Sequence, residues 1–270
     1  MQTGNVCGIN TGMKITKTSV RHFLANVVCA FIYNDMTRKR VRAIINSPYF
    51  AWRRFVCSDS GVARSRIKLL TGFSGRNLIF VAGDKYVYKF IHKWGIKNIE
   101  QREFDIATAL AGVSPIPLVV PTILNTPYGL VRRYNFAPGM TLRKIVKKYP
   151  QKYKKYKEYL GKQIANFIYE VARHSPAEID KYKNTNRADK SKLRNPGYMY
   201  GWYHGDVGDN FMIDPETFRV TSVIDLESMT YGDFSAAWPW ESDEMVSDFN
   251  KCIKRHYDEI WNEHHKKPRK

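Results

Sequence analysis

The chain has 270 residues, 43% of them hydrophobic and 14% aromatic, which is enough to bury a substantial core as one large domain or two lobes. Its 44 lysines and arginines outnumber its 25 acidic residues, and the formal charge of +19 favours anionic partners such as nucleotides, phosphosugars, nucleic acid or acidic membranes. The four cysteines include no C-x-x-C pair, which excludes a dense disulfide framework and the usual metal-binding spacings and fits a reducing cytosol: Cys7, Cys29, Cys57 and Cys252.

The first 70 residues hold 12 lysines and arginines against 2 acidic residues, a net charge of +10. Apolar residues recur there at intervals of three and four, which predicts two amphipathic helices, around Leu24–Phe31 and Val41–Ile45. The apolar run Phe23–Tyr33 is far shorter than the roughly 20 residues of a membrane-spanning helix, so we expect neither a span nor a signal peptide. Basic and aromatic residues near these helices are compatible with an anionic bilayer surface or with an added helical layer: Arg38, Lys39, Arg40, Arg42, Trp52, Arg53 and Arg54.

The next region has the pattern of a β-sheet. Two β-favouring runs, Asn77–Val81 and Tyr86–Ile91, flank the turn signal Ala82-Gly83-Asp84-Lys85, which predicts a hairpin. Helical spacing follows over Ile99–Leu110, and after an apolar run we expect a further strand pair around Gly129–Phe136.

Beyond Pro138-Gly139 the chain is predicted to be mainly helical, with one apolar face over Leu160–Val171. The polar stretch Asp180–Pro196 is typical of a surface loop or insertion. Two strand-like runs, Phe211–Ile213 and Val220–Leu226, precede a helical C-terminal region.

Transfer of a terminal phosphoryl group requires a phosphate cradle, a cation, metal-binding oxygens and a carboxylate near the attacking hydroxyl, and the sequence has a candidate for each. Gly72, Ser74 and Gly75 form a loop whose backbone amides could approach phosphate oxygens, although the loop alone is typical of an ordinary turn. Lys89 lies within a predicted strand, where burial is costly unless the amine faces an anion or a carboxylate. Glu103 is the candidate carboxylate; a solvated lysine and a surface glutamate would explain the same pattern.

The strongest signal is the segment His204-Gly205-Asp206, followed by Asn210 and by the strand that ends at Asp225. An acidic residue in a loop can orient or deprotonate a hydroxyl, while an amide oxygen and a second acid can bind the magnesium ion of a nucleotide. A turn aspartate and a strand-end cap explain each acid singly, but the two together favour the functional interpretation. We expect His204 to support the loop rather than to react.

The order of these features resembles that of the aminoglycoside phosphotransferase and choline kinase family, relatives of the protein kinases, over about Lys68–Trp240. The features are, in chain order, the glycine loop, the strand lysine, the helix glutamate, H-G-D, the asparagine and I-D-x-E. The resemblance implies an α+β, protein-kinase-like two-lobed fold, with a small β-rich N-terminal lobe and a larger helical C-terminal lobe. The expected divisions are a basic helical extension at 1–67, a nucleotide-binding lobe at 68–136 and a catalytic and substrate lobe at 137–270.

The resemblance also implies residue roles, with ATP and Mg²⁺ as cofactors. Asp206 would be the catalytic aspartate, and Asn210 and Asp225 the metal ligands. Lys89 and Glu103 would pair as a phosphate clamp, and Leu130–Phe136 would form the hinge that receives adenine. The implied nucleotide-binding residues are Gly72, Ser74, Gly75, Lys89, Glu103 and Tyr134.

One departure from the family pattern concerns the loop after Asp206, where three residues rather than four precede Asn210. Either Asn210 reaches the metal by a tighter path, or Asp209 supplies the oxygen, or activity is impaired.

The chain is therefore predicted to be an ATP-dependent phosphotransferase that acts on a hydroxyl of a small molecule, sugar or glycolipid such as a lipopolysaccharide core. A catalytically impaired, kinase-like binding module is the alternative. The positive charge and the interleaved lysines and tyrosines over 147–159 indicate either an anionic acceptor or only a solvated helix face. We expect a cytoplasmic protein in peripheral contact with the inner face of a membrane. We do not expect nucleic acid as a partner, because no fingerprint of that class is present.

Overall fold

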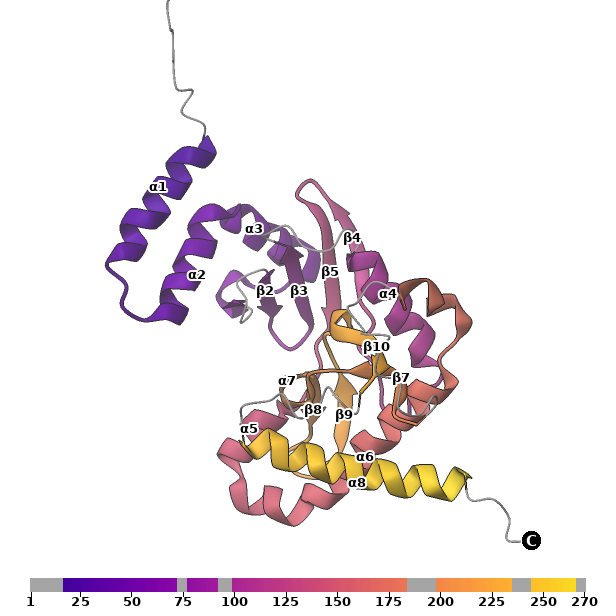
Figure 1. The fold of residues 1–270 in the computed structure, drawn as a ribbon. Helices are drawn as coiled ribbons and strands as arrows, with labels where there is room; N and C mark the ends of the chain where they lie inside the picture. The colour runs from indigo at the N-terminus through magenta and orange to yellow at the C-terminus, as the bar shows by residue number, and fades with distance from the viewer. Residues whose placement is uncertain (1–16, 72–76, 92–98, 184–197, 235–243, 266–270) are drawn as a thin grey trace, which may run out of the picture.

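The computed structural model describes residues 17–71, 77–91, 99–183, 198–234 and 244–265. Figure 1 shows two lobes, with a helical hairpin extending from the N-terminal one. That hairpin consists of α1 (Lys17–Ala30) and α2 (Asp35–Asn46), and α3 (Tyr49–Ser60) follows it. The first two helices confirm the predicted pair, and α3 is a helix that periodicity did not indicate.

The N-terminal lobe is built on an antiparallel five-stranded sheet with the order β1-β2-β3-β5-β4. The strands are β1 (Ile67–Thr71), β2 (Asn77–Ala82), β3 (Tyr86–Ile91), β4 (Thr122–Thr126) and β5 (Gly129–Asn135). The predicted hairpin is confirmed as β2 and β3. β1 was not predicted, and it follows the short 3-10 turn Arg64–Arg66.

The two faces of this sheet contact different parts of the protein, because successive side chains along a strand point to opposite faces. Phe80 and Phe90 point to one face, where α3 covers them and Trp52 stacks on Phe90 with ring centroids 4.6 Å apart. Ile79 and Lys89 point to the other face, toward the second lobe. α3 is therefore a helical layer of this lobe; the proposed boundary at residue 67 stays a prediction.

The C-terminal lobe contains a second, larger core. Its long helices α6 (Pro150–His174) and α8 (Glu244–His265) lie side by side in Figure 1. Between the lobes is α4 (Ile99–Ala111), whose buried apolar residues belong to the larger core. The smaller elements are β6 (Met140–Thr141), α5 (Leu142–Lys148), a 3-10 turn (Ala177–Tyr182), β7 (Tyr200–His204), α7 (Val207–Asn210), β8 (Phe211–Ile213), β9 (Val220–Val223), η4 (Leu226–Ser228) and β10 (Met229–Asp233).

Short strands in this lobe bring the H-G-D segment and Asp225 together. β7 pairs with β10, and β8 pairs with both β6 and β9. β9 ends at Val223, earlier than predicted, because Asp225 adopts a left-handed conformation with φ 59° and starts η4. Most of the predicted surface loop, 184–196, lies outside the described residues. Among the described helices, none has both the length and the apolarity needed to cross a bilayer.

Candidate active site

A cavity of about 390 Å³ lies between the lobes, beneath the open face of the N-terminal sheet. Its upper wall comes from β1, β2 and β3 and is apolar except for Lys89, and its lower wall comes from β8 and from the end of β9. Three polar side chains expected at a phosphoryl-transfer site reach it from both lobes. The lining consists of Leu70, Ile79, Val81, Val87, Lys89, Val119, Tyr134, Asn135, Phe136, Ala137, Gly139, Thr141, Lys144, Asn210, Met212, Ile224 and Asp225.

His204 joins the two aspartates through their backbones. Its Nδ1 accepts the N–H of Asp206 at 3.1 Å, so Nε2 carries the proton and donates to the carbonyl oxygen of Asp225 at 3.3 Å. Burial lowers the pKa of this imidazole, which outweighs the opposite effect of the two carboxylates. His204 is therefore a neutral brace that holds the two loops in one arrangement.

Asp206 and Asn210 lie at the two ends of α7. The carboxylate of Asp206 caps this helix by accepting the N–H of Asp209 at 3.3 Å, and the side chain is half-buried. Asn210 is buried and lines the cavity together with Asp225. Asp209 instead forms an exposed ion pair with Arg143 at 3.0 Å. Of the two possible oxygen donors, Asn210 thus faces the cavity, and the shortened loop reaches it through the single turn of α7.

Lys89 projects from β3 into the cavity and is buried. Its amine donates to Asp225 Oδ1 at 2.5 Å and lies 2.9 Å from Glu227 Oε2. The expected ion pair of Lys89 with Glu103 is therefore wrong for this state of the protein. The reason is a second cation. Arg132 lies directly opposite Lys89 in the β3–β5 register and forms the ion pair with Glu103.

Arg132 is the centre of a buried charge network. It bonds Glu103, and it contacts Glu227 at 2.5 Å, so that Glu227 is shared with Lys89. Burial raises the pKa of Glu103 despite the nearby cations. Burial also opposes the charge of Glu227, but Lys89 and Arg132 outweigh it and hold the pKa of that carboxyl below its usual range. The network links α4, β3, β5 and η4.

Tyr134 and Arg102 complete these links. Tyr134, predicted at the adenine-binding hinge, lines the cavity and donates its hydroxyl proton to Glu103 at 2.8 Å. Arg102 ties α4 to the backbone after Asp225 by donating to the carbonyl oxygens of Glu227 at 2.8 Å and Met229 at 2.6 Å.

The structure thus brings Lys89, Tyr134, Asn210 and Asp225 to one cavity and places Glu103 behind it. The predicted phosphate loop, Gly72, Ser74 and Gly75, lies outside the described residues. Sequence reasoning missed Arg132 and Arg102. The available signal for Arg132 was its position directly after Leu130 and Val131, whereas Arg102 stands between polar residues and gave no signal.

Comparison with known proteins gives a fold and no closer relationship. No protein-family model matches the sequence, and no curated protein matches it either. Solved structures of aminoglycoside phosphotransferases match it. The GDP complex of wild-type aminoglycoside 2'-phosphotransferase-IIIa has a TM-score of 0.59 at 14% identity and covers 79% of this chain and 84% of its own.

Two further structures agree with that match. The streptomycin-ATP ternary complex of APH(2")-IIa has a TM-score of 0.58 at 14% identity over 79% of this chain and 83% of its own. ADP-bound APH(2'')-Ib has a TM-score of 0.56 at 14% identity over 78% and 82%. The predicted α+β, kinase-like fold is confirmed by these similarities.

Proposed function

We infer that the protein is an ATP-dependent phosphotransferase that uses Mg²⁺ and transfers a phosphoryl group to a hydroxyl of an anionic acceptor. One observation carries this inference: Lys89 from one lobe meets Asp225 from the other, beside Asn210, in a cavity whose upper wall is otherwise apolar. The similar structures include complexes with GDP, ATP and ADP, which supports a nucleotide as the ligand of this cavity.

The cavity has suitable groups for each part of a magnesium nucleotide. Ile79 and Met212, on opposite walls, provide apolar surface for the base. The oxygens of Asn210 and Asp225 are hard ligands of the kind that Mg²⁺ prefers, and the ion when bound neutralises charge on the phosphates. Lys89, held ready by Asp225 and Glu227, is the cation for the phosphate oxygens.

Asp206 has the position and exposure of a residue that orients the acceptor. It is half-buried at the start of α7, and Asn210 at the other end of that helix faces the cavity. Its carboxylate can therefore accept the proton of an acceptor hydroxyl, while His204 holds its backbone in place. Lys144 on the cavity wall supports an acceptor that carries negative charge.

The experiment that tests this proposal measures binding of magnesium-ATP by calorimetry and ADP production with a panel of sugar, glycolipid and small-molecule acceptors. Asp206→Ala should retain nucleotide binding and lose turnover, and Asp225→Ala should weaken both. Asp84→Ala, at an exposed turn of the N-terminal lobe, is the matched control and should behave as wild type. Absence of nucleotide binding in the wild type would rule the proposal out, and binding without turnover on every acceptor would favour the impaired, kinase-like binding module.

In this proposal the acceptor is held at an anionic membrane surface, and the exposed residues of α1 support contact with such a surface. Its small residues, Ala25 and Cys29, are buried, while Phe23 and Phe31 are 68% and 78% exposed. The large apolar residues exposed on α1 and directly after it are Val20, Phe23, Leu24, Val27, Val28 and Phe31, and Asn26 and Ala30 of α1 are exposed as well. Exposed basic residues on α2, such as Lys39, lie beside it. An apolar face flanked by positive charge is the pattern of a helix that lies on an anionic bilayer.

Vesicle co-sedimentation tests the membrane contact separately from catalysis. The protein should pellet with phosphatidylserine-containing vesicles at low salt, and a Phe23→Ser/Phe31→Ser variant should pellet less. Failure of the wild type to bind anionic vesicles at low salt would remove the membrane contact and leave the phosphotransferase proposal standing.

A further inference from the structure

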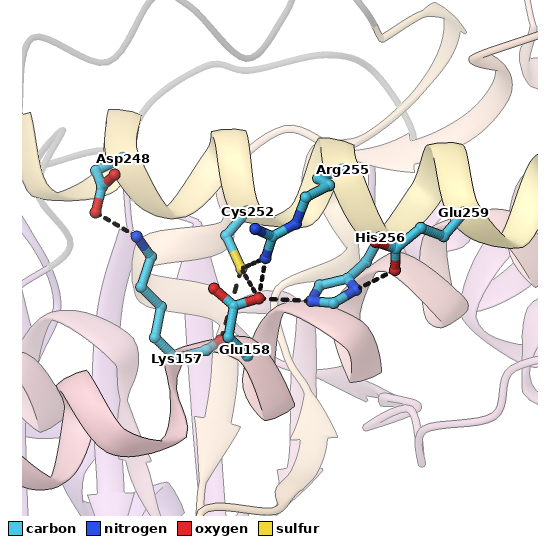
Figure 2. A network of polar contacts seen from close by, with 7 residues as sticks. All are labelled: Lys157, Glu158, Asp248, Cys252, Arg255, His256 and Glu259. Atoms are coloured by element: carbon cyan, nitrogen blue, oxygen red, sulfur yellow. Dashed lines mark hydrogen bonds and ion pairs between the residues drawn. The ribbon is translucent and has the colours of Figure 1, made fainter.

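A cluster of metal-ligating side chains lies where α6 and α8 pack together, and it shares no residue with the lining of the interlobe cavity (Figure 2). Glu158 comes from α6. Cys252 and His256 are one turn apart on α8 and therefore lie on the same side of that helix. One donor atom from each residue lies within 4.8 Å of the other two. Cysteine spacing along the sequence did not predict a metal site, because the third group comes from another helix.

Two of the three distances between the donor atoms are close to those of a tetrahedral metal site. His256 Nε2 lies 2.9 Å and Cys252 Sγ 3.5 Å from Glu158 Oε2. For Zn–N and Zn–S distances of about 2.0 and 2.3 Å, the edges of a tetrahedron are about 3.3 to 3.6 Å long. The two distances to Glu158 thus lie within a few tenths of an ångström of these edges, and the third, between Nε2 and Sγ, is no longer than 4.8 Å.

The second ring nitrogen of His256 is held as it is in many metal sites. Nδ1 contacts Glu259 Oε2 at 2.8 Å, and because a carboxylate only accepts hydrogen bonds, Nδ1 carries a proton. By the same rule Nε2 carries a proton toward Glu158, and a metal ion at this position has to replace that proton. A carboxylate behind a histidine fixes the ring and increases its basicity as a ligand.

Helix α6 makes room for the sulfur atom. A Cβ atom on Gly161 would lie 2.5 Å from Cys252 Sγ, so any larger residue there would displace the thiol. Glycine in the middle of a helix is unfavourable by roughly 0.5–1 kcal/mol relative to alanine, and at this position it keeps Cys252 at the helix contact.

Arg255 is the group that competes for this site. Figure 2 shows its guanidinium beside Glu158 and Cys252. It contacts the carboxylate of Glu158 and lies 3.9 Å from Cys252 Sγ. The arginine side chain is more than half exposed, so it can turn into solvent without leaving a buried charge behind. In the state described here, Arg255 supplies the positive charge that a metal ion would otherwise supply.

We propose that Glu158, Cys252 and His256 form a zinc site that joins α6 to α8, with water as the fourth ligand. Mixed sulfur, imidazole and carboxylate donors suit Zn²⁺ better than Mg²⁺ or Ca²⁺. Binding replaces the thiol proton of Cys252 and the Nε2 proton of His256, releases both protons to solvent and displaces Arg255 from Glu158. A metal that binds only the folded chain stabilises it, so the site acts as a clamp on the C-terminal lobe.

The test uses the full chain after treatment with a chelator, and cobalt(II) as a spectroscopic substitute for zinc. One equivalent of Co²⁺ should bind and give a thiolate-to-cobalt absorption band in the near ultraviolet. That band should disappear in Cys252→Ser and persist in Cys57→Ser, the matched control on α3. Absence of the band in the wild type, or its persistence in Cys252→Ser, would overturn the proposal.

The competing arginine gives a second measurement that does not depend on removing a ligand. Arg255→Ala should tighten the apparent dissociation constant of Zn²⁺ by roughly two- to fivefold, the range expected when one exposed ion pair no longer competes. Unchanged or weaker affinity in Arg255→Ala contradicts the proposed competition. Neither result bears on the interlobe cavity, because no ligand of the zinc site lines it.

Discussion

Two of the charge networks among the described residues contain the same kinds of groups in opposite surroundings. Between the lobes, Arg132 and Glu103 form an ion pair in which the side chains are 1% and 0% exposed. Between α6 and α8, Glu158 and Arg255 form an ion pair in which both side chains are 56% exposed. Each network joins elements distant in sequence, but the loss of stability expected when an ion pair is removed differs between them.

The difference follows from the solvation of the partner that remains. A charge left alone in the interior loses its compensation and has no water to replace it, whereas an exposed charge is promptly hydrated. The buried network therefore holds Lys89 and Asp225 in one arrangement, while the exposed network can rearrange, exchange its cation and accept a metal ion. Four measurements can break or sharpen this contrast.

The largest effect is expected for Arg132→Met, which leaves the buried Glu103 without its cation and leaves Glu227 with Lys89 alone. The free energy of unfolding in guanidinium chloride should fall by about 3–5 kcal/mol. Combining Arg132→Met with Glu103→Gln should recover part of the loss, because the most deeply buried carboxylate is then neutral. A loss below about 1 kcal/mol would mean that this network has no more energetic weight than a surface pair.

The next effect is on nucleotide chemistry rather than on stability. Lys89→Met removes the cation that faces Asp225 in the cavity, and turnover should fall by roughly 10²- to 10³-fold, as for other preorganised charge-stabilising groups. Lys85→Met is the control, because Lys85 lies four residues away at the hairpin turn and donates to the carbonyl oxygen of Ser60. Equal loss of turnover in both variants would contradict a specific role for Lys89.

The sequence predicted the parts of this site that depend on local order. Asp206, Asn210 and Asp225 stand in compact motifs, and β2 and β3 follow from the turn between them. Periodicity predicted α1 but could not show that its small residues face inward, because an amphipathic pattern does not identify the partner of either face.

Arg132 could not be predicted in the same way. Its role depends on the register that places it opposite Lys89 across β3 and β5, and two strands more than forty residues apart decide that register. The zinc cluster has the same origin, since only the spacing of Cys252 and His256 is visible in the sequence and Glu158 is supplied by packing.

A smaller, pH-dependent effect should come from His204. Burial holds its pKa below the ordinary value of 6.5, so the folded state stays neutral where the unfolded state takes up a proton. Stability is therefore lost as the pH falls below 6.5, with a slope of up to about 1.4 kcal/mol per unit until the folded-state pKa is reached. Urea unfolding between pH 7.5 and 5.5 should show this slope reduced in His204→Asn and retained in His174→Asn, the exposed control. Equal slopes in both variants would exclude His204 as the source.

The smallest effect is expected in the exposed network. Glu158→Gln, measured in the presence of a chelator so that no metal contributes, should change the free energy of unfolding by less than about 1 kcal/mol, because both members of the lost pair remain hydrated. The change should shrink further in 1 M salt, where the screening length is about 3 Å. Asp248→Asn, which breaks the neighbouring exposed pair with Lys157, should behave alike.

A loss above about 2 kcal/mol in Glu158→Gln alone would show that this carboxylate is effectively buried and unable to exchange Arg255 for a metal ion. That result would remove both the contrast between the two networks and the physical basis of the zinc clamp. The contrast requires two results together. Without metal, Glu158→Gln should lower the free energy of unfolding only slightly. With Zn²⁺ added, the difference between wild type and Glu158→Gln should be larger, because the bound ion depends on this carboxylate whereas the metal-free fold does not.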